Sequence, residues 1–158
     1  MHTHPSPFNT LRKCFFYCRW AMSLLMISNL YGCLNETIDN YFATFAEAMD
    51  DMNRGWIPEW LPNTATKIFE THNIDTNSRM LRFSFPMHNP LTLPPLCKQT
   101  TSANLPPPPF NRSWWQTDIT TNSKTNSYTF FQCQDRHGTL PEIANIAIAP
   151  QTGIAFVW

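Results

Sequence analysis

The residues of this 158-residue chain whose types and spacing best suit chemistry are His72 and Asp75, three positions apart. An imidazole and a carboxylate within hydrogen-bonding reach form the acid–base pair of many enzymes, and they also bind metal ions. The surrounding sequence, THNIDTNS, is rich in turn-forming residues, so the alternative is a hairpin loop bonded to its own backbone. We favour the loop, and we therefore predict no catalytic residue, no metal site and no cofactor.

The rest of the chain offers little support for an enzyme. It contains no nucleophile-elbow motif, no phosphate-binding loop and no zinc-protease motif. His88 and His137 have no partner at the spacing of zinc ligands. The sequence thus predicts that the protein is not an enzyme.

A basic region and an uncharged apolar run, residues 20–30, precede Cys33. The run is shorter than the roughly 20 apolar residues of a permanent membrane span. With the sequence Leu-Tyr-Gly-Cys that ends at Cys33, it resembles the signal peptide and lipobox of bacterial lipoproteins, although Tyr31 stands where a small residue is usual. The resemblance implies that residues 1–32 are a signal peptide and that lipid on Cys33 anchors the mature chain. A buried hydrophobic helix and an uncleaved anchor are the alternatives.

Cleavage before Cys33 changes the charge and the cysteine count. The whole chain has no net charge, whereas residues 33–158 hold 8 Lys and Arg against 11 Asp and Glu, a net charge of −3. Neither balance favours nucleic acid as a partner. Cys97 and Cys133 remain as an even pair in an oxidising compartment, so we predict a disulfide between them, with two buried thiols as the alternative.

The spacing of apolar residues predicts one amphipathic helix after Cys33. Apolar side chains recur at intervals of three and four from Ile38 to Met52, and Gly55 can take the left-handed conformation that ends a helix. We expect this helix to pack on a sheet. The alternative is an aromatic stripe that binds a partner.

Alternating polar and apolar residues predict strands in the remainder of the chain. The clearest segments are residues 66–71, 80–85, 128–134, 145–149 and 154–158. Gly153 can take the left-handed position that closes a hairpin between the last two. The expected fold class is α+β, with one N-terminal amphipathic helix packed on a mostly antiparallel sheet of four to six strands, in a single domain of residues 33–158.

Two features interrupt this pattern. Residues 86–112 are rich in proline and predict a stiff connection, with a polyproline ligand for an aromatic groove as the alternative. The irregular segment with Trp56 and Trp60 is expected to fold back over the end of the helix, and Trp114 and Trp115 stand in an expected strand at residues 113–116. If they are exposed, these four tryptophans form a candidate binding surface.

The GWIPEWLP segment, followed by THNIDTN and an alternating strand, is similar to a set of small, uncharacterised bacterial lipoproteins. The similarity covers roughly residues 30–86. That family has no assigned activity, so the resemblance implies no site residues.

Three functions follow as expectations. We favour a lipid-anchored module of the bacterial envelope that binds an envelope protein or a glycan, with the membrane as a further partner through the N-terminal lipid. Leu34 after the lipidated cysteine implies the outer membrane, facing the periplasm. The alternatives are a periplasmic enzyme or enzyme inhibitor, and a structural component of a larger envelope complex.

Overall fold

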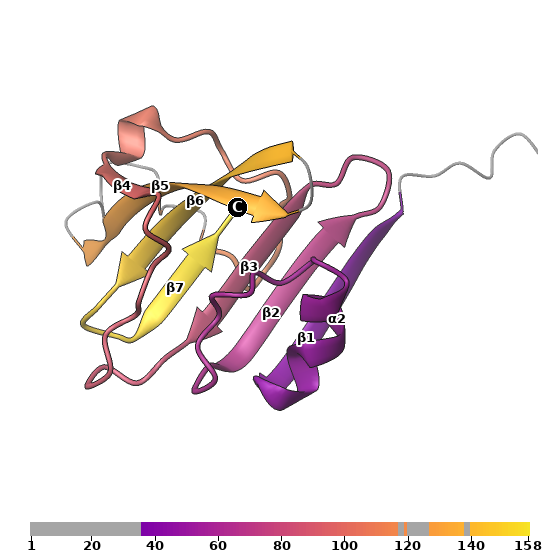
Figure 1. Ribbon diagram of the computed structural model, residues 1–158, viewed down its shortest axis with the longest axis horizontal. Coiled ribbons are helices and arrows are strands. Elements are labelled where there is room, and N and C mark those ends of the chain that lie inside the picture. Colours follow the sequence, from indigo (N-terminus) through magenta and orange to yellow (C-terminus); the bar gives the residue numbers. More distant parts are fainter. Residues whose placement is uncertain (1–35, 117–118, 120–126, 138–139) are drawn as a thin grey trace, which may run out of the picture. The chain divides into compact units, whose positions relative to one another are not determined.

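The computed structural model of the protein describes residues 36–116, 119, 127–137 and 140–158. In these ranges seven strands form one antiparallel sheet, in the order β1-β2-β3-β7-β6-β5-β4 (Figure 1). The predicted signal peptide and Cys33 lie outside the described residues.

The elements of the described ranges are two 3₁₀ turns, one short helix and the seven strands. In chain order they are β1 (Thr37–Thr44), η1 (Ala46–Ala48), α2 (Met49–Asn53), β2 (Thr66–Asn73), β3 (Arg79–Ser84), β4 (Cys97–Thr100), η2 (Ser102–Asn104), β5 (Thr129–His137), β6 (Leu140–Ala149) and β7 (Ile154–Val157). The expected mixture of helix with a mostly antiparallel sheet is confirmed, but the sheet has seven strands and not four to six.

The prediction of one long amphipathic helix from Ile38 to Met52 is wrong. Its first half is strand β1, and its second half is η1 followed by the single turn of α2. The segment TIDNYF also alternates with the period of a strand, and β-branched and aromatic residues favour an extended backbone when a neighbouring strand is present to pair with. None of the helices in the described ranges is long and apolar enough to cross a membrane.

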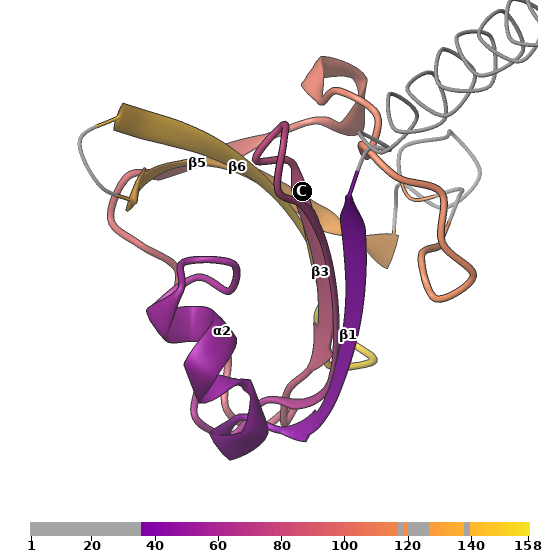
Figure 2. The ribbon, with the colours of Figure 1, turned by 90° about the vertical axis from the view of Figure 1, so that its right-hand side faces the viewer.

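Both faces of the sheet are covered. Figure 2 shows that the sheet is strongly curved, with α2 on its concave side. The larger core lies on this concave face, where Ile57 and Leu61 from the Trp/Pro segment pack with Ile68 and Phe83. A second core covers the convex face with Met80, Trp115, Ile119, Phe130, Ala147, Phe156 and Trp158.

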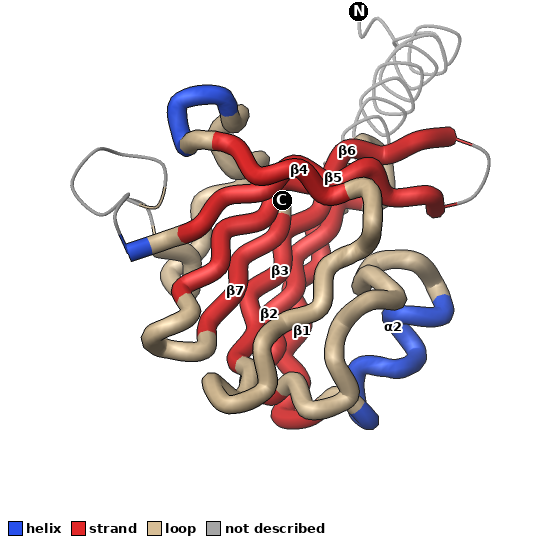
Figure 3. Tube along the Cα trace, turned by 60° about the vertical axis from the view of Figure 1, so that its left-hand side comes forward, coloured by secondary structure: helices blue, strands red, loops and turns tan. Residues whose placement is uncertain are grey.

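Long loops provide most of this cover, as the tan segments in Figure 3 show. Residues 45–65, here called the covering segment, lie on the concave face. The proline-rich connection, residues 86–112, contributes Leu91 and Leu93 to the concave core but Leu105 and Phe110 to the convex core. It thus carries the chain from one face to the other, and strand β4 forms within it.

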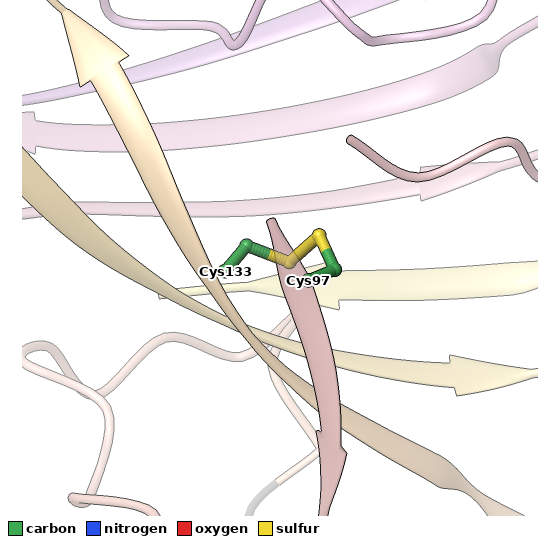
Figure 4. The surroundings of a disulfide bond; sticks show 2 residues. All are labelled: Cys97 and Cys133. Carbon is green, nitrogen blue, oxygen red and sulfur yellow. A yellow bond between two sulfur atoms is a disulfide. The ribbon is translucent and has the colours of Figure 1, made fainter. Parts of the chain in front are cut away.

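The disulfide predicted between Cys97 and Cys133 is present (Figure 4). It joins directly opposed residues of β4 and β5. The short edge strand β4 is therefore held to the sheet by a covalent bond as well as by its ladder.

Two glycines confirm the turn geometry expected from the sequence. Gly55 has a φ of 85°, and its N–H donates to the Met52 carbonyl at 2.9 Å, which ends α2. Gly153 has a φ of 63° and closes the β6–β7 hairpin. A Cβ at Gly153 would lie 2.2 Å from the Phe85 carbonyl oxygen, so this turn has room only for glycine.

Replacement of Cys97 and Cys133 by serine is expected to lower the free energy of unfolding. The bond closes a loop with a sequence separation of 36, for which the chain-entropy estimate is about 3–4 kcal/mol. Urea unfolding under non-reducing conditions would measure the loss. Addition of a reductant should reproduce it in the wild type and have no effect on the double variant; equal stability of the two oxidised proteins would contradict the prediction.

Candidate functional site

A cluster of polar side chains is enclosed between the concave face and the covering segment. Glu70 and His72 stand two residues apart on β2, so both side chains point to the same face of the sheet. Glu70 Oε1 lies 2.9 Å from Nδ1 of His72. Their exposed fractions are 0% and 3%.

Three further side chains surround this pair and complete what we call the acid–histidine cluster. The amide of Asn40, on β1, donates to Glu70 Oε2 at 3.0 Å and to Oδ2 of Asp51, on α2, at 2.9 Å. The ring of Trp56 stacks on His72, with ring centroids 3.8 Å apart and planes inclined by 9°. The cluster therefore joins β1 and β2 to the covering segment.

Burial controls the protonation of the cluster. The pKa of Glu70 is raised from 4.5 to about 8, chiefly by removal from water and in smaller part by the Asp51 and Asp39 carboxylates, against the lowering effect of the bond from Asn40. Burial also lowers the pKa of His72, an effect that the nearby Asp51 carboxylate opposes and Arg54 reinforces. Both groups are thus driven toward their neutral forms at neutral pH, in which the Glu70 carboxyl can donate its proton to Nδ1 of His72.

A carboxyl bonded to an imidazole is a familiar acid–base pair, but here both side chains are buried. Among the described residues, the imidazole ring of His72 hydrogen-bonds to Glu70 alone. Two surface hollows lie elsewhere, one lined by β4 and β5 and the other by the turn at residues 76–79 and the proline run. The cluster holds the covering segment against the sheet. The bond from Arg79, on β3, to the Gly55 carbonyl at 2.7 Å does the same.

The convex face carries a row of three aromatic rings, here called the aromatic ladder: Tyr41 on β1, Phe69 on β2, and Trp114 from the loop that covers them. The centroids of Tyr41 and Phe69 are 4.8 Å apart, and those of Phe69 and Trp114 are 5.8 Å apart with planes inclined by 24°. The Arg82 guanidinium lies 5.4 Å from the centre of the Phe69 ring, within the range of a cation–π contact. Tyr41 is 56% exposed, so one end of the ladder reaches solvent.

A charged pair stands beside the ladder. Arg112 Nε donates to Asp39 Oδ1 at 2.6 Å, and the hydroxyl of Thr71 donates to the same oxygen. Partial burial works to raise the pKa of Asp39, but the bonds from Arg112 and Thr71 outweigh it and hold the pKa below its ordinary value. The pair ties the loop that carries Trp114 to strand β1.

The four predicted tryptophans do not share one surface. Trp56 and Trp60 lie on the concave side, where Trp60 meets Phe83 edge-on, and the buried indole N–H of Trp60 has no acceptor among the described residues. Trp114 and Trp115 lie on the convex side, and Trp115 is buried. None of the four is exposed, whereas Tyr41, which the sequence placed in the aromatic stripe of the expected helix, is.

His72 and Asp75 are not brought together. His72 belongs to β2 and points into the concave core, whereas Asp75 is exposed in the turn that follows. Sequence reasoning missed Glu70 because it placed His72 in a loop. The useful signal was the Glu-Thr-His order within a strand, since residues two apart share a face. Asn40 and Asp51 come from distant segments, and no local pattern marks them.

Part of the chain matches a known protein family. The profile of a family described as the YbbD head domain matches residues 36–84. This span is less than half of the chain, and it contains β1, α2, β2 and β3 with the whole acid–histidine cluster. No curated protein and no solved structure matches the chain.

Substitution of Glu70 by glutamine is expected to flatten the dependence of stability on pH. Glu70 binds its proton more tightly in the folded protein, so its contribution is full below pH 4.5 and is lost as the pH rises through about 8. Between pH 7 and 8.5 His72 is largely neutral in the folded and the unfolded protein. In this range the loss of the Glu70 proton changes the free energy of unfolding by at most about 1.4 kcal/mol per pH unit.

Urea unfolding at pH 7 and at pH 8.5 would measure this slope in both proteins. Glu59→Gln is the matched control, because it removes an exposed carboxyl from the same covering segment. Equal slopes in the wild type and Glu70→Gln would contradict the assignment of the elevated pKa to Glu70.

Proposed function

We propose that the protein is a lipid-anchored binding or assembly module of the bacterial envelope, and not an enzyme. Cys33 carries the lipid after residues 1–32 are removed, and the domain that follows engages an envelope partner. The observation that carries this proposal is the position of the aromatic ladder, which ends at the exposed Tyr41 beside the Asp39–Arg112 pair.

The side-chain types of this surface fit recognition. Tyr, Trp and Arg are enriched at protein interfaces, because they offer large contact area together with hydrogen bonds. On this face Phe69 contacts the ring of Tyr41, and Arg112 is fixed by its bond to Asp39. Trp114 in turn stacks on Phe69. Such preorganised side chains lose little conformational entropy when a partner binds.

The acid–histidine cluster supports the same proposal by exclusion. A catalytic pair must meet its substrate, and the 0% and 3% exposed fractions of Glu70 and His72 leave no path to it. The family match covers nearly the same span as the similarity to bacterial lipoproteins, which supports a shared domain type. The proposed site of action is the outer membrane, on its periplasmic side.

The lipid anchor is expected to be lost in Cys33→Ser. Cells grown with a clickable palmitate analogue should label the wild-type protein and not the variant, because the thiol is the acceptor of the diacylglycerol. Cys97→Ser is the control and should keep its label. Label that persists in Cys33→Ser would contradict lipidation at this residue.

A photo-crosslinking amino acid in place of Tyr41 is expected to form an adduct in living cells, because the proposed partner contacts this ring. Gln151, exposed in the β6–β7 turn, is the matched control position and should give none. Immunoblots of irradiated envelopes would show the shift in mass. No adduct at position 41, or equal adducts at both positions, would contradict the proposed surface.

A further inference from the structure

The two edges of the sheet are protected to very different degrees. β4 forms one edge and is four residues long; it carries the exposed Lys98, follows Pro94 and Pro95, and is bound to β5 by the disulfide. A short strand, a lysine and nearby prolines are common ways in which proteins prevent an edge from pairing with another chain. β1 forms the other edge, and its eight residues include neither lysine nor proline.

The backbone of β1 has an open row of hydrogen-bonding groups. The N–H of Ala43 donates to Glu47 Oε2 at 2.9 Å, so it points away from β2. Because the N–H and C=O groups of a strand alternate between its two sides, those of Thr37, Asp39 and Tyr41 point away from β2 as well. The register with β2 is constant along β1, which keeps this alternation intact. Glu47 therefore closes one end of the edge, and no strand in the described ranges pairs with the rest.

The charge around this edge selects a partner. Two exposed acidic residues lie next to the ends of β1, Glu36 and Glu47, and a third, Asp39, lies on β1 and is paired with Arg112. The sequence contains no lysine or arginine between Cys33 and Arg54. A second copy of β1 would bring the same acidic groups together, whereas a basic strand would meet complementary charge.

We propose that β1 binds a basic, extended segment of a partner polypeptide, which adds to the sheet as an eighth strand. The segment bonds to the outward groups of Thr37, Asp39 and Tyr41, and its alternate side chains lie on the convex face beside the ring of Tyr41. Backbone bonds provide the affinity, and the exposed carboxylates with the aromatic ladder provide the preference for basic residues. This inference rests on the proposed binding function and names the class of partner.

A designed peptide tests the proposal on the full-length protein. The probe is a fluorescent peptide as long as β1 in which lysine and valine alternate, and fluorescence anisotropy measures its binding. A matched peptide with proline in place of two valines keeps the charge but cannot pair as a strand. We expect saturable binding of the first peptide, weakened by salt, and at least about tenfold weaker binding of the second, because several backbone bonds are lost.

Two variants of the chain separate the backbone from the side chain. Tyr41→Pro removes the outward N–H and should weaken binding more than Tyr41→Ala, which keeps it. Thr37→Pro removes another outward N–H at the first residue of the strand, where proline is best tolerated, and it replaces Tyr41→Pro if that variant does not fold.

Four results would overturn the proposal. Equal binding of the two peptides would show attraction by charge alone. Self-association of the wild type that Tyr41→Pro abolishes would assign the edge to a second copy of the chain. Binding to purified peptidoglycan, but not to the strand peptide, would assign the surface to a glycan. An adduct at Tyr41 in cells without binding of the strand peptide would refute this edge and leave the proposed function standing.

Discussion

The sheet buries apolar side chains on both of its faces, and the rest of the structure depends on this constraint. A sheet buried on both sides is usually covered by helices or by a second sheet, whose own backbone bonds are complete. Here long loops provide the cover, with α2 as a single turn of helix (Figure 3). Such segments carry backbone groups that need partners, since an unpaired buried group is costly. Two side chains donate to such backbone carbonyls. Arg79 bonds to the Gly55 carbonyl of the covering segment at 2.7 Å, and the Trp158 indole bonds to the Pro106 carbonyl of the proline-rich connection at 2.8 Å.

The acid–histidine cluster also holds the covering segment to the sheet, and its burial is costly because it places a carboxyl and an imidazole in the core. The cost of burying charge is reduced in two ways. Both groups are driven toward neutral forms, and the amide of Asn40 supplies donors to both Glu70 and Asp51. A polar network that is satisfied in this way fixes one arrangement of the surrounding segments, because any other arrangement leaves a buried group unpaired. The cluster therefore fixes the positions of β1, β2 and the covering segment relative to one another.

Local patterns in the sequence predicted the features that depend on local physics. The alternation of polar and apolar residues predicted the strands of the β2–β3 and β6–β7 hairpins. Turn chemistry predicted the left-handed Gly55 and Gly153, and an oxidising compartment predicted that the two cysteines pair. The helix expected from Ile38 onward failed because TIDNYFAT satisfies both a helical and a strand period, and the presence of β2 decides between them. Asn40, Asp51 and Glu70 meet across separations that no local pattern encodes. Once β1 is known to be a strand, however, alternation places the side chain of Asn40 on one face of the sheet and those of Asp39 and Tyr41 on the other.

Strand β1 connects the interior of the protein with its proposed binding surface. Its inward side chains, Ile38, Asn40 and Phe42, face the core and the acid–histidine cluster, while Asp39 and Tyr41 face the convex side. A lone edge strand is the least constrained part of a sheet, because its ladder is satisfied on one side only. The bonds of Asn40 to the cluster and of Asp39 to Arg112 hold β1 from both faces, although no strand in the described part of the chain pairs with its outer edge. An edge fixed in this way can present its backbone to a partner without the ordering cost that a flexible segment would add to binding.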